Sequence, residues 1–487
     1  MGYPGCSTHV SPGRRSRRPG PGPRRVGDLL LAALALLALT SARAPRLHTP
    51  RAVDAIRLAT GLSLHQGDCD RCHSMHGDDQ PAVYGNALVG PNDNTLCFSC
   101  HSAPGPSLWS DALYRATSHG SDPVMVWPGP NPPMRIEADA PTKCLNCHDP
   151  HGWMSGDSLV KHLALAPEEK LCLTCHDGHP ASTDVRSELS MPFRHPVTDY
   201  HDRHQGAGEF QPTDFGVAPL NRRHSECEDC HNPHVSRADA LGRPVGSDAS
   251  TTTLGVSRVA VLNGGAGAAP SYQFLAGADT LTPPVAEYQL CFKCHSSWTT
   301  QPSGQSDLAL LLNPNNPSFH PVEAVGRNPG IQATAFVPGW GTNSITRCGG
   351  CHGSDVPTVR GVHGSLYPAI LRRNSVTSSS THASSPDELC FSCHAYGAYA
   401  DPASSPIERG ASRFNAPASP YGHAEHVGTA QVPCFACHET HGSTRQPFLI
   451  ATGRVPGMTS YTSNPSGGTC TSTCHVDVKT YAINYAR

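Results

Sequence analysis

The chain has 487 residues, of which 37% are hydrophobic and 15% are charged, with a formal net charge of −3. It contains 46 Gly and 46 Pro, residues that form turns and interrupt helices. With so few apolar side chains beside them, the chain cannot build a large core from protein alone. This composition excludes a coiled coil, a polytopic membrane protein and a helical solenoid. The 21 Cys and 29 His indicate instead that disulfides, metals or covalently attached cofactors hold the chain together.

The first 44 residues have the composition of a secretory signal. A basic lead with six Arg precedes the apolar run Leu29–Leu39, and the small-residue segment Thr40–Ala44 follows. The run is too short to span a bilayer, so we expect cleavage and export, with a retained membrane anchor as the alternative and no transmembrane segment in the mature chain. Residues 1–44 contain seven Arg and one Asp, so the mature chain has about nine more acidic than basic residues. Such a surface favours a cationic protein partner and disfavours nucleic acid.

Every cysteine after Cys6 belongs to one of ten pairs, and each pair is followed at once by a histidine, here called the motif histidine. Nine motifs have the spacing C-x-x-C-H, and the tenth has one more residue between its cysteines. Numbered 1 to 10 in chain order, the motifs are Cys69, Cys72 and His73; Cys97, Cys100 and His101; Cys144, Cys147 and His148; Cys172, Cys175 and His176; Cys227, Cys230 and His231; Cys291, Cys294 and His295; Cys348, Cys351 and His352; Cys390, Cys393 and His394; Cys434, Cys437 and His438; and Cys470, Cys474 and His475.

C-x-x-C-H is the attachment motif of c-type haem. Two thiols on one turn of chain can each add to a vinyl group at one edge of the porphyrin, and the next residue, His, then binds the iron. Zinc sites and disulfides are the alternatives, but neither requires a histidine directly after the second cysteine. The spacing therefore predicts ten covalently attached haems c. Because motif 10 has a longer loop between its cysteines, the alternative that it binds no haem stays open.

Ten haems would supply the flat apolar surface that the side chains lack. We therefore expect a mostly irregular, loop-rich chain with short α-helices, wrapped thinly around a row of covalent haems, and we expect it not to fold without them.

The motifs occur as five doubled units, and most first motifs carry a second histidine three residues further on. In the fourth unit Gly353–Asp355 follows the motif histidine, and His363 is the substitute. These five downstream histidines are His76, His151, His234, His363 and His441. With this sequence pattern the chain resembles the doubled-CxxCH multihaem cytochromes, which are common among metal-respiring and other anaerobic bacteria. The resemblance implies that each haem is bound by two histidines and that electrons pass along a row of haems.

The downstream histidines are candidates for the second axial position. His76 cannot reach the iron already bound by His73, because the free site lies on the opposite face of a wide ring, but it can reach a neighbouring haem. One histidine upstream of each doubled unit can provide the remaining ligands, and His224 and His426 compete for this role. With only seven Met in the chain, all-His ligation and low, overlapping potentials are expected. The upstream histidines are His65, His119, His195, His320 and His423.

The predicted boundaries follow the doubled units, after the signal at 1–44. Units 1 and 2 (haems 1–4) occupy 45–188, unit 3 (haems 5–6) 189–300, unit 4 (haems 7–8) 301–400 and unit 5 (haems 9–10) 401–487. Second motifs are expected on short helices and first motifs in turns. The insertion at 236–286 contains a partly alternating, β-branched segment, Thr253–Leu262, followed by a Gly-rich turn. It is either a docking or packing β-hairpin or a covering loop.

Three functions remain open at this point. The first is an electron carrier of the periplasm or cell exterior, with cationic-surfaced redox proteins or outer-membrane electron-transfer components as partners. The second is a subunit that assembles with its own copies into an extracellular cytochrome filament. The third is a multihaem reductase of nitrite or hydroxylamine, which needs an open axial position on one iron. No motif replaces its histidine by Lys, so nothing in the sequence indicates such a position.

Overall fold

A computed structural model describes the part of the chain that carries the ten motifs. The described residues are 69–74, 88–91, 93–102, 110–122, 144–152, 154–155, 158–159, 163–166, 168–198, 225–237, 246–301, 304–328, 330–376, 378, 380, 382–414 and 421–482. They all belong to one unit of the chain, residues 65–487. The predicted signal at 1–44 and the candidate ligands His65 and His76 lie outside the described residues. No helix of the described part is long and apolar enough to cross a membrane.

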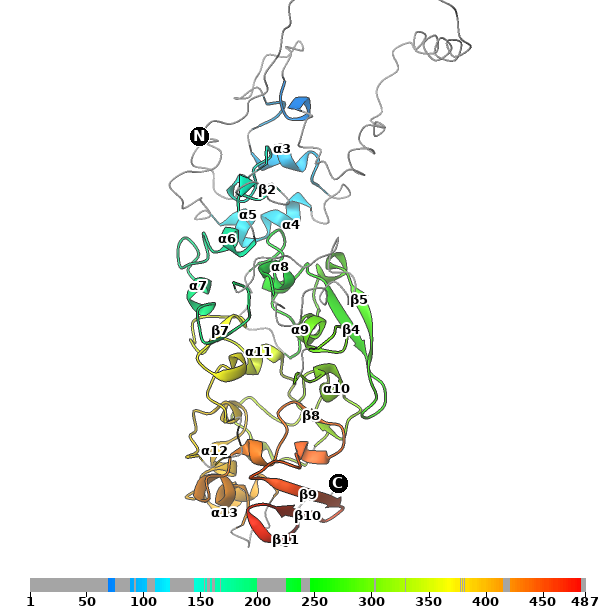
Figure 1. Cartoon of the computed structure of the whole chain (residues 1–487), viewed down its shortest axis with the longest axis vertical. Helices are drawn as coiled ribbons and strands as arrows, with labels where there is room; N and C mark the ends of the chain where they lie inside the picture. The colour runs from blue at the N-terminus through cyan, green and yellow to red at the C-terminus, as the bar shows by residue number, and fades with distance from the viewer. Residues whose placement is uncertain are drawn as a thin grey trace, which may run out of the picture. The chain divides into compact units, whose positions relative to one another are not determined.

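The helices are short. The longest, α9, has nine residues, and several begin at a side-chain cap such as Ser110, Thr117, Asp307 or Ser405. The α-helices are α3 (Asn94–Phe98), α4 (Asp111–Arg115), α5 (Ser118–Ser121), α6 (Glu168–Cys172), α7 (Val185–Glu188), α8 (Cys227–Cys230), α9 (Glu287–His295), α10 (Leu308–Leu312), α11 (Cys348–Cys351), α12 (Tyr396–Tyr399) and α13 (Pro406–Gly410) (Figure 1).

Single turns of other helix types fill many of the remaining positions. The 3-10 turns are Cys69–Arg71, Cys144–Asn146, Thr251–Thr253, Gly277–Thr280, Ala333–Ala335, Pro368–Ile370, Leu389–Ser392, Cys434–Ala436 and Pro447–Leu449, and Ala424–Thr429 is a π-helix.

The strands form small antiparallel pairs and one three-stranded sheet. The pairs are β1–β2, β3–β7, β4–β5 and β6–β8, and the sheet has the order β11–β10–β9. The prediction of a loop-rich chain with short helices and a small β-hairpin is therefore confirmed. The strands are β1 (Met154–Ser155), β2 (Ser158–Leu159), β3 (Phe193–Arg194), β4 (Arg258–Leu262), β5 (Ser271–Leu275), β6 (Ser318–Phe319), β7 (Gly364–Ser365), β8 (Gly442–Ser443), β9 (Met458–Asn464), β10 (Gly467–Ser472) and β11 (His475–Ala482).

Two of the strand pairs join segments from different doubled units. In β3–β7, Phe193 pairs with Ser365, and in β6–β8, Phe319 pairs with Gly442. Each pair is only two residues long, and in both the next residue of the earlier strand is an upstream histidine. The strand pairs thus bring an upstream histidine of one unit next to a downstream histidine of the following unit.

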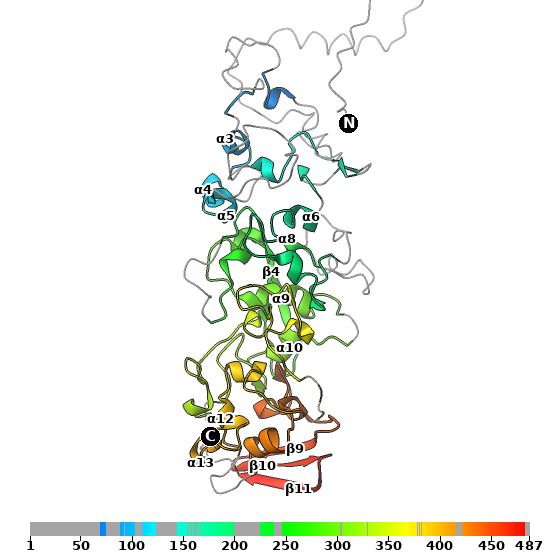
Figure 2. The ribbon, with the colours of Figure 1, turned by 90° about the vertical axis from the view of Figure 1, so that its left-hand side faces the viewer.

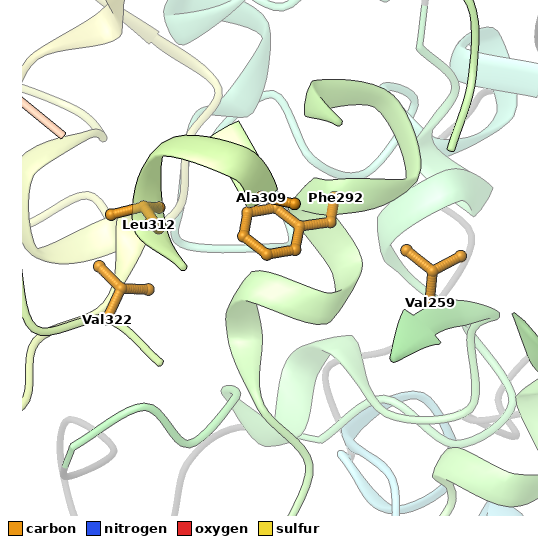
Figure 3. Close-up of a cluster of buried hydrophobic side chains, with 5 residues drawn as sticks. All are labelled: Val259, Phe292, Ala309, Leu312 and Val322. Carbon is orange, nitrogen blue, oxygen red and sulfur yellow. The ribbon is translucent and has the colours of Figure 1, made fainter. Parts of the chain in front are cut away.

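The insertion of unit 3 folds into the hairpin β4–β5, which lies against α9 (Figure 1). Its first strand begins at Arg258 and not at Thr253, because the Ser250 side chain caps a 3-10 turn over Thr251–Thr253. The hairpin is a packing element, since Val259 is fully buried in a cluster that also contains Phe292 of α9 (Figure 3). This favours the packing hairpin over the covering loop.

Apolar side chains are buried in small separate clusters. The largest in the described part has five buried residues, and the others have three each. Such clusters are far too small to offset the conformational entropy of so long a chain by themselves. The five residues of the largest cluster are Val259, Phe292, Ala309, Leu312 and Val322 (Figure 3).

The expectation of helices for second motifs is met throughout motif 6 and in part in motifs 2 and 4, whose first cysteines, Cys97 and Cys172, lie in α3 and α6. In motif 6, α9 continues through Cys294 to the motif histidine. In motif 2, α3 ends at Phe98, so Cys100 lies beyond the helix. The physical reason is local, because the Ser99 hydroxyl donates to the carbonyl of Leu96 at 2.6 Å and so satisfies a carbonyl that a longer helix would use.

The expectation of turns for first motifs also needs correction. Motifs 5 and 7 are first motifs, yet they form the short helices α8 and α11. In α8 the Asp229 carboxylate accepts a hydrogen bond from the backbone N–H of Glu226 at 2.7 Å, as in a capping box. Motifs 1, 3 and 9 begin with the expected single turns of 3-10 type.

Motif 10 departs furthest from the expectation that second motifs lie on helices. Cys470 is in β10, and His475 is the first residue of β11. Strand β10 is hydrogen-bonded on both sides, and its Thr-rich sequence suits a strand better than a helix. The extra residue of the motif lies in the tight β10–β11 turn, where the Ser472 hydroxyl accepts hydrogen bonds from the backbone N–H of Cys474 and His475.

Candidate haem-binding centres

Each described motif brings its two thiols and its histidine close together along the backbone. In motif 7 the N–H of His352 donates to the carbonyl of Cys348 at 2.8 Å, and in motif 9 His438 donates to Cys434 at 2.9 Å. No disulfide joins the twenty motif cysteines, all of which are described. Among the described residues, no group of three or more His, Cys, Asp or Glu is placed to hold a metal ion by itself, whereas a structural zinc site needs four such ligands around one point.

The predicted haem-attachment cysteines Cys100 and Cys294 differ in their surroundings, which the identical motifs did not indicate. Cys100 is exposed, and its Sγ lies 3.8 Å from the Ser99 hydroxyl. Cys294 is half-buried at the end of α9, and its backbone carbonyl accepts a hydrogen bond from the Gln301 side-chain amide at 2.8 Å. Both directly precede a motif histidine, so their place in the attachment motif is the same, but only Cys294 is partly enclosed by the protein.

Eight motif histidines lie opposite a second histidine. The ring centres in every pair are between 6.0 and 6.3 Å apart. The pairs, motif histidine first, are His73/His151, His148/His234, His176/His119, His231/His363, His295/His195, His352/His441, His438/His423 and His475/His426.

The separation of the rings fits two axial ligands of one iron. Two metal–nitrogen bonds of about 2.0 Å, with the distance from nitrogen to ring centre on each side, give about 6 Å between imidazoles that share an ion. The eight pairs therefore fit a haem iron between the two rings, with the motif cysteines beside it.

The downstream histidines cross from one doubled unit to the preceding one. His151 of unit 2 lies opposite His73 of unit 1, and His441 of unit 5 lies opposite His352 of unit 4. His234 and His363 follow the same rule, with His148 and His231 respectively. All four downstream histidines that the structure describes therefore face the first motif of the preceding unit.

The upstream histidines His119 and His195 lie opposite the second motif histidine of their own unit, at His176 and His295. Unit 5 differs, because His423 lies opposite His438 of the first motif and His426 lies opposite His475 of the second.

His426, which the sequence offers only as a competitor of His423, lies opposite a motif histidine of its own. The sequence contains a signal for this arrangement, because a unit 5 whose His441 faces unit 4 has only upstream histidines to place opposite its own two motifs.

Motif 8 is the case in which the ring geometry is less direct. The ring of His394 lies next to those of Phe336 and Tyr399, at 5.6 and 5.2 Å. Burial lowers the pKa of His394 to about 4, and the field of the upstream histidine His320 contributes in the same direction. The candidate partner of His101 in motif 2, His65, lies outside the described residues.

A recurring hydrogen bond orients the upstream histidines. In four of them Nδ1 lies 2.5–3.0 Å from the backbone carbonyl of the residue directly before another candidate ligand. With Nδ1–H as the donor, the lone pair is on Nε2, which is the arrangement that second-shell hydrogen bonds impose on metal-binding imidazoles. The four bonds are His119 to Pro233 (before His234), His195 to Val362 (before His363), His320 to Thr440 (before His441) and His426 to Gly422 (before His423).

Motif histidines of the first motifs are oriented in the same way. Nδ1 of His352 lies 2.8 Å from the carbonyl of Ala369, and Nδ1 of His438 lies 3.0 Å from that of Phe448. Both acceptors are in left-handed backbone, with φ of 57° and 59°, which costs a non-glycine residue about 1 kcal/mol. These turns therefore need a partner that holds them, and the imidazole provides it.

Burial keeps the candidate ligands neutral. It lowers the pKa of His363 to about 3 and that of His176, His234 and His441 to about 4, so that these rings are unprotonated at neutral pH. A neutral imidazole is the form that binds metal. Burial likewise raises the pKa of the Cys147, Cys230 and Cys351 thiols to about 12.

Cysteines of consecutive motifs lie next to one another. Between units, the first thiol of a second motif is within hydrogen-bonding distance of the first thiol of the next unit. These pairs are Cys97 and Cys144, Cys172 and Cys227, Cys291 and Cys348, and Cys390 and Cys434. Within units, the second cysteine of the first motif is within electrostatic reach of the second motif at Cys72 with Cys100, Cys147 with Cys175, Cys230 with Cys291, Cys351 with Cys393 and Cys437 with Cys470. Each motif thus adjoins the one before it and the one after it.

Comparison with known proteins supports the class of site. The family model described as "Doubled CXXCH motif" matches the chain twice, at residues 63–105 and 138–181, which are units 1 and 2. The doubled motif points to a multihaem c-type cytochrome that transfers electrons and binds haem c covalently through its CxxCH motifs. No curated protein and no solved structure matches the chain.

Proposed function

We propose that this protein binds ten haems c and conducts electrons along them in the order of their motifs. Each haem, when bound, supplies an iron that takes up and gives back one electron. The adjacency of consecutive motif cysteines, from motif 1 through motif 10, carries the proposal. Because electron tunnelling weakens steeply with distance, haems anchored at adjacent thiols make a continuous path.

The ligand set of the proposal is all histidine. The ten motif histidines supply one axial ligand each, and the eight ring pairs supply the second ligand for all motifs except 2 and 8. For motif 8 we assign His320, because its Nδ1 bond to Thr440 repeats the bonds of His119 and His195, whose rings face the second motifs of their units. For motif 2 we assign His65, because it lies upstream of unit 1 as His119 and His195 lie upstream of units 2 and 3.

The order of the haems can be tested directly. A structure of the haem-loaded protein should show each haem with its nearest neighbours at the preceding and following motifs. Haems whose nearest neighbours are not consecutive in sequence would overturn the proposed path.

An electron carrier fits this ligand set better than a reductase. Two histidines on each iron leave no axial position for nitrite or hydroxylamine. We therefore expect the reduced protein to bind no CO and to show no turnover with either substrate. Prompt binding of one CO per chain, with turnover, would favour the reductase.

The proposed location is the periplasm or the cell exterior. The signal-like segment at 1–44 supports export, and the acidic mature chain supports cationic-surfaced redox proteins or outer-membrane components as partners. If so, binding to such a partner should weaken steeply as salt is added.

A cytochrome filament is the alternative assembly. A filament held by shared ligands would need a motif that takes its second histidine from another copy. At motif 9 the same chain provides the second histidine, since the ring centres of His423 and His438 are 6.1 Å apart. This favours separate molecules over that mode of sharing. Negative-stain electron microscopy of haem-containing material sheared from cells, with mass spectrometry to identify this chain, decides between filaments and small particles.

A further inference from the structure

The insertion hairpin of unit 3 brings a fully buried cation to the junction of motifs 5 and 6. The Arg258 side chain at the start of β4 is 0% exposed, and Lys293, between the two cysteines of motif 6, is 1% exposed. Motif 5 forms α8 and motif 6 is on α9, and both helices lie near β4 (Figure 2). Buried cations are rare in proteins, because removal from water costs several kcal/mol per ion.

Backbone and hydroxyl groups hold both cations in place. The Arg258 guanidinium donates to the carbonyl of Ala286, directly before α9, at 3.2 Å, and to the hydroxyl of Thr253 at 3.0 Å. The Lys293 ammonium donates to the carbonyl of Asp229, directly before Cys230, at 3.0 Å, and to the hydroxyl of Ser257 at 3.2 Å. The two charges therefore lie between the last turn of motif 5 and the helix of motif 6.

The fields of these charges reach the thiols that anchor the two haems. Arg258 places a positive potential on Cys230 and Cys291, and Lys293 acts on Cys230. The carboxylates oppose the cations and act more strongly on the same thiols, Asp229 on Cys230 and Glu287 on Cys291. Glu287 also accepts a hydrogen bond from the N–H of Gly349 at 2.7 Å and lies 3.5 Å from the Arg347 guanidinium, so it is shared with unit 4.

A cation beside motif 9 shows the contrast. Arg454 acts on Cys437, but its guanidinium lies 2.6 Å from the Glu439 carboxylate and its side chain is 19% exposed. Solvent therefore screens the charge of Arg454 in addition to its ion pair, whereas the charges of Arg258 and Lys293, which Asp229 and Glu287 oppose, are shielded from solvent.

We propose that Arg258 and Lys293 raise the reduction potentials of the fifth and sixth haems by offsetting the negative charges of Asp229 and Glu287. This inference rests on the proposed function, because it requires haems at motifs 5 and 6. An electron added to an iron is stabilised by a nearby positive charge, and low polarity around the charge strengthens the effect. The hairpin insertion then has an electrostatic role as well as a packing role.

Spectropotentiometric titration of the haem-loaded protein tests the proposal. In Arg258→Gln and in Lys293→Gln, about two of the ten haems should titrate at lower potential, and the rest of the curve should stay in place. Arg258→Lys keeps the charge and should leave the curve near that of the wild type. Arg327→Gln is the control, because Arg327 also donates to backbone carbonyls, those of Asn315 and Asn316, and these contacts lie within unit 4.

The outcomes separate the inference from the function on which it rests. Curves of both Gln variants that superimpose on the wild type, with ten haems present, overturn the role of the two cations. An equal shift in Arg258→Lys and Arg258→Gln also overturns it, since the shape of the side chain and not its charge would then matter. A wild-type protein that lacks covalent haem at motifs 5 and 6 contradicts the proposed function itself. If Arg258→Gln does not take up ten haems, Lys293→Gln alone decides.

Discussion

Nδ1 of His320 lies 2.7 Å from the backbone carbonyl oxygen of Thr440, the residue directly before His441. His441 in turn lies opposite His352, at 6.2 Å between ring centres and 7° between ring planes. One hydrogen bond thus links the candidate ligands of motifs 7 and 8, which belong to unit 4, through a loop of unit 5. Because the same bond recurs at His119 and His195, backbone contacts of the candidate ligands join successive units.

Removing one crossing ligand should open one haem. In His441→Gly we expect ten covalent haems, of which one, at motif 7, becomes high-spin and binds CO in the reduced state. The physical reason is that His441 supplies the imidazole opposite His352 from a different unit. The measurement is a CO difference spectrum against a pyridine haemochrome count.

His179→Gly serves as the matched control for that variant. His179 is an exposed histidine that faces no motif histidine in the described part of the chain, so all ten haems should stay six-coordinate. A CO spectrum of His441→Gly that equals the wild type would show that His441 is not an axial ligand.

The two upstream histidines of unit 5 should open different haems. The planes of His423 and His438 are 28° apart, whereas those of His426 and His475 are 87° apart. Crossed imidazole planes make the two iron orbitals that overlap with the rings nearly equal in energy, which gives a more axial low-spin EPR signal than parallel planes do. His426→Gly should therefore remove axial signal, and His423→Gly should remove rhombic signal.

Loss of the same signal in both variants would contradict the separate assignment of His423 and His426. EPR spectra of the ferric protein, normalised to haem content, make the comparison.

The sequence predicts the composition of the sites better than their connections. The spacing of the motifs predicts that Cys348 and His352 lie close together, because that geometry is local. Which histidine lies opposite His352 depends on how unit 5 packs on unit 4, and nothing near His441 in the sequence encodes it.

The local conformation of the second motifs shows where analogy between motifs fails. Cys294 lies on a helix as expected, but Cys100 lies beyond the end of α3, where the Ser99 hydroxyl takes up the Leu96 carbonyl. In motif 10 the Thr-rich sequence and two strand partners override the expected helix altogether. Residues between and beside the cysteines, and not the cysteines themselves, therefore decide the backbone conformation of each motif.

Glu323 should make stability depend on pH. Burial raises the pKa of its carboxyl to about 7, although a hydrogen bond from Asn263 at 2.7 Å acts in the opposite direction. The folded state then holds the proton more tightly than the unfolded state, so the free energy of unfolding falls as pH rises from about 4.5 to 7. Glu323→Gln should stabilise the protein by about 1–3 kcal/mol at pH 8 and have little effect at pH 4.

Denaturation midpoints of the haem-loaded protein at the two pH values test this. Asp387→Asn, at an exposed carboxylate, is the control. A gain for Glu323→Gln that is the same at pH 4 and pH 8 would contradict the titration of a buried carboxyl.

The chain should not fold without haem. Its largest described apolar cluster has only five buried residues. We expect haem-free protein, produced without haem attachment, to melt without a cooperative transition by circular dichroism. A cooperative transition would mean that the protein contacts suffice.

The central claim is that the chain binds ten haems covalently, and intact-protein mass spectrometry under denaturing conditions tests it most directly. Noncovalent cofactors are lost under these conditions, whereas thioether-bound haem is retained. The account predicts the mass of the processed polypeptide plus ten haems. A mass with fewer haems would contradict it, and peptide mapping would then show which of the ten motifs lacks one.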